Sequence, residues 1–420
     1  MNPSGIISGL LLHLHPKSIN RQTLKFTRTF GLGGINLLLF LVLAFTGLLL
    51  RFAYVPTPAE AYNSVLQLQN NTFLGSLLRN IHHWSAIMMV IAAFLHLLRV
   101  FYSQSIYYER KRNWIYGLIM LAFVLSFNFT GYLLPWDQLS YWAVTIMTNI
   151  LEYLPLVGNN LANIVRGGEY VNENTLSIFY NLHTGLLPIF FIALMAIHFW
   201  LVRKAKGVTF SDKGEVEKVP VYPNLIHREI IVAIVLLVFV LTISIFFDAP
   251  LLDRANPMVS PNPSKAPWYF VGFQELLIHL HPLLSAFIIP FLLVGFLIGI
   301  SFMKIDKDLV GSWFYGQKGG RAVGGSTIFA LLLTITLILL LEYVLNPIEF
   351  TQWPLFVSTG LLPLFLYVIP VIFFLLIIYK MMHLNRAEIM MSIFTLLVVS
   401  YLVMSVVGYY FRGESMHLVF

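Results

Sequence analysis

The chain has 420 residues, of which 58% are hydrophobic and 11% charged, and its mean hydropathy is +0.79. This composition excludes a soluble globular protein and indicates several membrane-spanning segments, whose basic loops account for the net charge of +7 without a nucleic-acid partner. No cysteine is present, which excludes disulfides, thiolate-held iron–sulfur clusters and haem attached through thioether bonds.

Long apolar segments occupy most of the chain. A transmembrane helix needs about 20 mostly apolar residues to cross the hydrocarbon core. We therefore predict an all-α fold, a polytopic transmembrane helix bundle of about nine spans joined by short connections. The predicted spans are centred near residues 43, 90, 124, 190, 238, 294, 336, 367 and 399.

Basic residues gather on alternate connections. They precede the first span and recur after the second, fourth and sixth spans, at residues 110–112, 203–206 and 304–307. The opposite connections are mainly acidic, so the positive-inside rule places the N-terminus in the cytoplasm. No small-residue cleavage site precedes the first span, and we expect no removable signal peptide.

Five histidines lie within the second and fourth predicted spans. His82 and His96 are fourteen residues apart, so they share a helix face and lie about 21 Å apart along the axis. His83 and His96 differ by about 140° in azimuth and do not share a face. His183 and His198 are fifteen apart and differ by about 60°, an angle that side-chain torsion and helix tilt can absorb.

The second and fourth spans run in the same direction, which sets His82 level with His183 and His96 level with His198. A single histidine in an apolar helix is normally a packed, hydrogen-bonded core residue. Four matched positions are not explained by packing, whereas two facing histidines form an axial pair for haem iron. We therefore predict two non-covalent b-type haems, one near each membrane face.

Two arginines extend this pattern. Arg79 lies one helical turn outward from His82, and Arg99 one turn outward from His96. Either guanidinium has the reach to pair with haem propionates. Arginines near helix ends also snorkel to the interface and follow the topology, and the sequence leaves both readings open.

Glycines repeat at the same interval on the first and third spans. Gly33 and Gly47 are fourteen apart, and so are Gly117 and Gly131. A flat macrocycle close to a helix requires a missing side chain. Small residues also serve helix–helix packing, but the shared interval indicates two haem planes passing two helices.

These features, with the segments "YVPTPAEAY", "RNIHHWSAIMMV", "GYLLPWDQLSYWAV", "FYNLHTGLLP" and "HFWLVRKAKG", resemble cytochrome b of the quinol-oxidising cytochrome bc and bf complexes. The resemblance covers roughly residues 25 to 300, and the N-terminal part is similar to the photosynthetic bf form. It implies that His82 and His183 ligate the outer haem, and His96 and His198 the inner one. The bf form has arginine where this chain has His83, so the ligand of the adjacent pair is His82.

The chain departs from the family at three places. Gly31 occupies the position of the cysteine that holds an extra haem in the bf form, and the chain continues past its fourth span, with one span more than the usual eight. The motif Pro-Glu-Trp-Tyr becomes "APWY", with Pro267 in place of the glutamate. Quinol oxidation releases protons, which need an acceptor. We predict Glu275, with Asp253, His279 and His281 as other candidates.

The resemblance also implies a function. Quinol is oxidised near the outer face, between the segment that contains Pro135 and Trp136 and the segment that contains Trp268 and Tyr269. One electron passes to a Rieske iron–sulfur protein, which feeds a c-type cytochrome or equivalent acceptor. The other crosses both haems and reduces quinone near the cytoplasmic face, which couples electron transfer to proton translocation. The family further implies a homodimeric complex. We expect the chain to lie in a bacterial cytoplasmic (inner) membrane, in contact with lipid and quinone.

We expect four parts in the chain: a cytoplasmic segment 1–30, a dihaem four-helix domain 31–210, a quinol-site loop with two spans 211–305, and C-terminal spans 306–420.

Two other functions use the same histidines. A dihaem anchor of a quinone-linked dehydrogenase would need neither the "LPWDQ" loop nor the later spans. A proton-coupled transporter would use the histidines as a relay and bind no haem.

Overall fold

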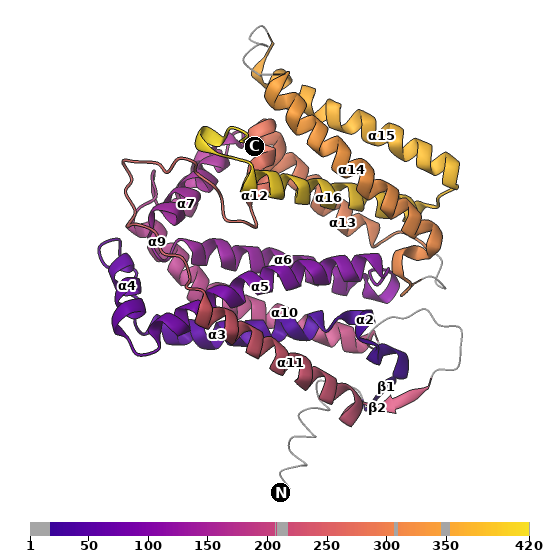
Figure 1. Ribbon diagram of the computed structural model, residues 1–420, viewed down its shortest axis with the longest axis horizontal. Coiled ribbons are helices and arrows are strands. Elements are labelled where there is room, and N and C mark those ends of the chain that lie inside the picture. The colour runs from indigo at the N-terminus through magenta and orange to yellow at the C-terminus, as the bar shows by residue number, and fades with distance from the viewer. Residues whose placement is uncertain (1–16, 206, 208–216, 306–309, 346–352, 420) are drawn as a thin grey trace, which may run out of the picture. The chain divides into compact units, whose positions relative to one another are not determined.

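The computed structural model describes residues 17–205, 207, 217–305, 310–345 and 353–419. Most of the expected cytoplasmic segment 1–30 lies outside these residues. The chain divides into two compact units, whose helices and strands are labelled in Figure 1. Unit 1 comprises Met1–Trp136, Leu176–Leu251 and Asp306–Ser312, and unit 2 comprises Asp137–Thr175, Leu252–Ile305 and Trp313–Phe420. The four expected parts remain a prediction.

The predicted helical membrane fold is confirmed. Within the described residues, nine helical segments are long and apolar enough to cross a membrane, and each contains one predicted centre. They are Leu32–Arg51, Gly75–Tyr102, Tyr108–Tyr132, Glu173–Lys204, Val221–Phe246, Leu283–Ile300, Gln317–Tyr343, Val357–Met382 and Arg386–Tyr410.

Unit 1 is built from five long helices. Helix α3 packs against α5, α6 against α10, and α11 against both α3 and α5. A short helix, α4, covers one end of α5, and strands β1 and β2 form an antiparallel pair in which Ile19 is opposite Val219. The bounds are β1 Ser18–Asn20, α2 Phe26–Thr29, α3 Leu32–Arg51, α4 Ala61–Asn71, α5 Gly75–Tyr102, α6 Lys111–Tyr132, α9 Glu173–Asn181, α10 Leu187–Lys204, β2 Lys218–Pro220 and α11 Val221–Phe246.

Unit 2 centres on α16, which packs against α12, α14 and α15. Two of its helices start with capping boxes: Asp137 and Ser140 bond reciprocally at the start of α7, and Asn385 and Glu388 do so at the start of α16. The bounds are α7 Gln138–Ile150, α8 Gly158–Arg166, α12 Val271–His279, α13 Ile289–Ile300, α14 Gln317–Tyr343, α15 Leu362–Met382 and α16 Arg386–Tyr410.

Three spans contain a π-helical turn just before a proline. The turns are Leu182–Leu186, Leu283–Ile288 and Val357–Leu361, each followed within two residues by Pro188, Pro290 or Pro363. Proline lacks the N–H that would continue the helix, and hydrocarbon offers no water to satisfy the freed carbonyls. Threonine hydroxyls in two of the turns donate to carbonyls one helical turn earlier: Thr184 to that of Tyr180, and Thr359 to that of Leu355, both at 2.8 Å.

Candidate functional site

His82 and His183 face each other in unit 1. His82 lies on α5 and His183 in the π-helical turn before α10. Their ring centroids are 6.3 Å apart, and the ring planes cross at 69°. Imidazole nitrogens bind metal ions at about 2 Å, so two rings on opposite sides of one ion have centres about 6 Å apart. The observed separation therefore fits a pair of axial ligands to haem iron.

His96 and His198 form the second pair, nearer the other ends of the same helices. Each of the two rings lies against a glycine of the neighbouring helix, His96 against Gly33 of α3 and His198 against Gly117 of α6. Both Nδ1 atoms are buried; that of His96 has no hydrogen-bond partner among the described residues, whereas the backbone of Asn113 lies within hydrogen-bonding reach of the His198 ring. Neighbouring His83 does not join either pair, because its ring packs edge-on against Trp84 with centroids 5.2 Å apart.

The fifteen-residue interval between His183 and His198 is accommodated by the backbone. A π-helical turn contains about one residue more than an α-helical turn. The extra residue is absorbed within the wider turn, so the rest of the helix is not rotated by the roughly 100° that an extra residue adds in a regular α-helix. Fifteen residues through the turn Leu182–Leu186 therefore have nearly the same effect as fourteen in a regular helix. The sequence predicts that side-chain torsion and helix tilt make this adjustment, whereas the structure uses the π-helical turn.

Each of the four glycines predicted to line a flat ligand lies against one of these histidines. A Cβ atom added to Gly131 would lie 2.6 Å from His183 Cε1, and one added to Gly47 would lie 3.2 Å from His82 Cε1. At the other level the matching distances are 3.8 Å for Gly33 to His96 and 3.7 Å for Gly117 to His198. Gly47 and Gly131 therefore make room for the imidazole rings of the outer pair, whereas at the inner level an added Cβ would make only ordinary van der Waals contact with the rings.

Two threonines next to these glycines were not predicted. Thr46 Oγ1 lies 2.9 Å from His82 Nδ1, and Thr130 Oγ1 lies 3.2 Å from His183 Nδ1. Both threonines are buried. The repeated triplet Phe-Thr-Gly, at residues 45–47 and 129–131, was the available signal. These contacts turn the Nδ1 side of each ring toward the protein and leave Nε2 available as a ligand.

The two predicted propionate partners are buried near the ends of α5. Arg79 donates to the carbonyl oxygens of Ala249 and Pro250, both at 2.6 Å, and to Gln69 Oε1 at 3.0 Å. Arg99 donates through Nε to the Arg28 carbonyl at 2.7 Å. Both arginines thus tie α5 to neighbouring segments, and their role toward propionates remains a proposal.

The predicted quinol-site residues are found in both units. In unit 1, Trp136 is buried and Pro135 partly so. In unit 2, Trp268 is 37% exposed and packs edge-on against Tyr269. The Tyr269 carbonyl accepts a hydrogen bond from the Tyr401 hydroxyl at 2.7 Å, which fixes the "APWY" segment onto α16.

Glu275 belongs to a cluster of charged side chains in unit 2. Arg412 donates to both Glu275 oxygens, at 3.0 and 2.6 Å, and to Glu342 at 2.8 Å. His279 Nε2 lies 3.0 Å from Glu275 and 3.1 Å from Arg412. The side chains of Glu275 and Arg412 are fully buried. We call Glu275, His279, Glu342 and Arg412 the ion cluster.

The ion cluster favours ionised Glu275. Burial opposes the charge, but the hydrogen bonds from His279 and Arg412 and the positive charge of Arg412 outweigh burial and hold the pKa of this carboxyl below its ordinary value. Burial lowers the pKa of Arg412, but its hydrogen bonds to Glu275 and Glu342 and their negative charges outweigh burial and raise it. Arg412 follows Glu275 by 137 residues, and nothing in the local sequence indicated that the two would meet.

The other two acceptor candidates also lie in unit 2. The Asp253 carbonyl accepts from the Gln138 amide at 2.8 Å, which joins the long loop to the start of α7. The ring of His281 packs edge-on against Tyr153 and Phe356. Neither residue is part of the ion cluster.

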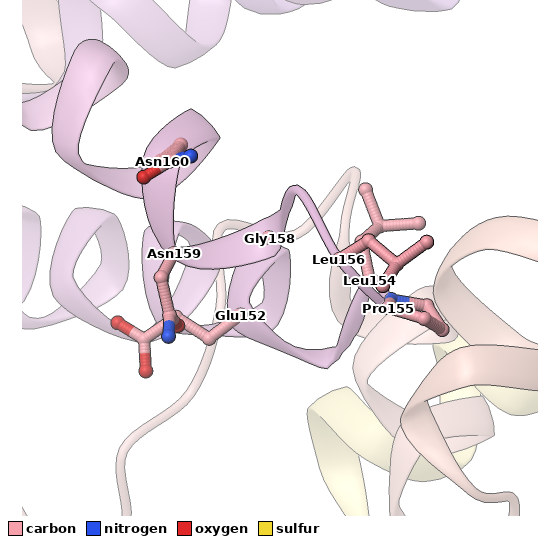
Figure 2. Close-up of a pocket in the computed structure, with 7 residues that line it drawn as sticks. All are labelled: Glu152, Leu154, Pro155, Leu156, Gly158, Asn159 and Asn160. Carbon is pink, nitrogen blue, oxygen red and sulfur yellow. The ribbon is translucent and has the colours of Figure 1, made fainter.

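A pocket of about 380 Å³ lies between the end of α7 and the start of α8 in unit 2 (Figure 2). Glu152 on its rim forms an ion pair with buried Arg166 at 2.9 Å. No predicted site residue is among those that line it, namely Glu152, Leu154, Pro155, Leu156, Gly158, Asn159 and Asn160. The pocket is therefore separate from the predicted haem and quinol residues.

Comparison with known proteins gives a consistent picture. The family model described as cytochrome b/b6/petB matches residues 19–206. Cytochrome b6 from Synechococcus elongatus is 43% identical over 173 residues, which are 41% of this chain and 80% of the relative. Cytochrome b6 from Tupiella akineta is 45% identical over 173 residues, with the same coverage.

A solved structure titled "Hyperthermophilic respiratory Complex III" has a similar fold. The TM-score is 0.66 at 19% identity, and the match covers 94% of each chain. At this identity the likeness supports the fold alone, and it extends over the C-terminal spans that the cytochrome b6 relatives do not cover. From the shared sequence of residues 19–206, their helices and the paired histidines, we conclude that this chain is an integral membrane protein of electron transport that belongs to the cytochrome b/b6 family.

Proposed function

We propose that the chain is the dihaem cytochrome b subunit of a quinol:cytochrome c oxidoreductase. The observation that carries this proposal is the pairing of four histidines at two levels of unit 1, each opposite a glycine. His82 and His183 would hold the outer b-type haem, and His96 and His198 the inner one. Haem bound there supplies one-electron oxidation and reduction at each level.

The residues of unit 1 prepare these two positions. Each ring lies against a glycine, and Thr46 and Thr130 orient the outer pair. Arg79 and Arg99 lie one turn beyond the ligands, where a guanidinium pairs with propionate. The two histidine levels would hold one haem toward each end of the apolar spans, an arrangement suited to electron transfer across the membrane.

We place quinol oxidation at the outer face, with Pro135, Trp136, Trp268 and Tyr269 as site residues and Glu275 as proton acceptor. Pro267 accepts no proton, which is why another group is needed. Glu275 is ionised in the ion cluster, and taking up a proton requires its contact with Arg412 to loosen. His279 contacts both groups and is the adjacent alternative.

The remaining parts of the proposal concern the whole complex. One electron passes to a Rieske protein and onward to a c-type cytochrome, while the other reduces quinone near the cytoplasmic face. Protons released outside and taken up inside couple the reaction to translocation. The basic loops support a topology with the N-terminus in the cytoplasm. We propose that the chain lies in a bacterial inner membrane and that the complex is a homodimer in contact with lipid.

A haem count tests this function first. We expect two b-type haems per chain by pyridine haemochrome and two components in a redox titration of the purified protein. Quinol-dependent reduction of cytochrome c by the isolated complex then separates this function from a dihaem anchor, which retains both haems but not this activity. Folded protein without haem would refute the proposal.

A further inference from the structure

The segment that leads into "APWY" is fastened to the last part of the chain. In unit 2, the Lys265 ammonium donates to the Tyr409 carbonyl at 2.9 Å, and the Ser415 amide donates to Asn262 Oδ1 at 2.6 Å. Helix α12, which follows "APWY", packs along α16. The ninth span and the residues after it therefore hold the predicted quinol-site segment of unit 2 on both sides.

The residues after α16 form a short hairpin that fixes Arg412. The Val419 amide donates to the Phe411 carbonyl at 2.9 Å, and Arg412 pairs with Leu418 in a β-bridge. Arg412 Nη1 also donates to the Met416 carbonyl at 2.9 Å. The hairpin therefore holds the guanidinium in one orientation, and this side chain is fully buried.

The guanidinium of Arg412 serves two carboxylates. Its Nε and Nη2 atoms donate to the two oxygens of Glu275 at 3.0 and 2.6 Å, while Nη1 donates to Glu342 at 2.8 Å. A bidentate contact between guanidinium and carboxylate is among the stronger ion pairs in proteins. One cation is thus shared between the acceptor proposed above and a second carboxylate, which comes from α14.

Arg412 and Glu342 act on Glu275 with opposite sign. A positive charge within a few ångström favours the ionised form of a carboxyl, whereas a second negative charge nearby disfavours it. The side chain of Glu275 is fully buried, whereas that of Glu342 is 15% exposed. Of the two carboxylates, Glu275 is therefore the one whose charge depends wholly on its protein partners.

We propose that Arg412 is a positioning residue of the quinol site, which the ninth span and the hairpin bring to Glu275 so that this acceptor is charged and ready for a proton, and that Glu342 limits the effect. This inference rests on the proposed function. In the step concerned, a quinol hydroxyl gives its proton to a carboxylate oxygen of Glu275, and the quinol electrons leave by the two routes already described. The ninth span thereby gains a role in the reaction.

The pH profile of the reaction reports the state of this acceptor. The acid limb of kcat/KM follows protonation of the essential base in the free enzyme. In the described part of the chain, the groups that face Glu275 are His279 on its own helix, Arg412 of the hairpin and, through Arg412, Glu342 of α14. His417 lies 3.8 Å from Glu342 and is mostly exposed. A change at Arg412 or Glu342 should therefore move the limb without removing the base.

Quinol-dependent reduction of cytochrome c by the isolated complex, measured across pH, tests the inference. Arg412→Gln removes the positive charge and should move the acid limb to higher pH by about 1–3 units. Arg412→Lys keeps the charge and should lie near the wild type. Glu342→Gln leaves the guanidinium to Glu275 and should move the limb to lower pH. At one pH on the limb, activity relative to each plateau should decrease from Glu342→Gln through wild type to Arg412→Gln.

Two controls separate this effect from folding. Lys318→Gln breaks another ion pair between α14 and α16, to Glu388 at 3.2 Å near the starts of both helices, and should leave the limb unmoved. Glu275→Gln should lower activity at every pH and abolish the limb. If Arg412→Gln does not fold, the opposite shift in Glu342→Gln still tests the sign.

Three results would overturn the inference: an unmoved limb in folded Arg412→Gln or in Glu342→Gln, an upward shift in both, or a wild-type limb in Glu275→Gln. In each case the wild-type complex keeps two haems and quinol-dependent activity, so the proposed function survives. Wild-type complex without haem or without this activity would instead overturn both proposals.

Discussion

The histidine-bearing helices of unit 1 and the ion cluster of unit 2 both bury polar side chains, but they assemble them in different ways. In unit 1 the partners lie on long helices at regular intervals, so helical geometry relates them. In unit 2, Glu275 meets Arg412 across 137 residues of chain. The difference shows that the helical period brings residues of one helix to the same face. Which charges far apart in the sequence meet is decided by tertiary packing.

The sharpest test of the helical argument separates the two adjacent histidines. His82→Ala should abolish the outer haem, because one axial ligand is lost, and should leave about one haem per chain. His83→Ala should retain both, since its ring packs against Trp84 instead. Pyridine haemochrome on the purified variants measures both outcomes, and equal losses would show that the wrong register was assigned.

The glycines allow a graded test within unit 1. Gly131→Ala places a methyl group 2.6 Å from His183 and should displace the ring, which weakens retention of the outer haem by about tenfold. Gly33→Ala gives an ordinary contact of 3.8 Å with His96 and is the matched control. Haem occupancy after dilution into detergent compares the two variants. Similar losses of haem from both would argue against a steric role for Gly131.

The ion cluster should matter for stability more than a surface pair does. Arg412→Ala leaves Glu275 buried without its cation and should destabilise unit 2 by about 3 kcal/mol. The control is Arg21→Ala, which breaks an exposed pair with Glu217 and should cost less than about 1 kcal/mol. Thermal unfolding midpoints in detergent measure the stability of both variants. Equal midpoints would show that the ion cluster stabilises the protein no more than the surface pair does.

The smallest expected effect is a pH dependence of the ion cluster. Because the pKa of Glu275 is lowered from 4.5 in the folded protein, its stabilisation is fully present above pH 4.5 and is lost as pH falls through the lower value. The facing groups are His279, Arg412 and Glu342. Thermal midpoints of wild type and Glu275→Gln should therefore converge in acid, and parallel curves would contradict this account.

Much of unit 1 was predictable from the sequence, for physical reasons. Apolar length defined the nine spans, and the regular α-helical period placed His82 and His96 on one face. The π-helical turn was not predicted, because it depends on how Pro188 is accommodated. Thr46 and Thr130 were missed because each appeared to be one more hydroxyl in a span. The partner of Glu275 depended on how α12, α14 and the end of α16 pack.

The π-helical turn at Leu182–Leu186 bears on how related chains are aligned. Two histidine-bearing helices of unequal residue count present their side chains at the same heights when one of them carries a widened turn. The constant quantity between ligands is then the number of helical turns, not the number of residues. An insertion or deletion at this point of a relative is thus compatible with an unchanged pair of ligands, provided that the backbone gains or loses the wide turn with it.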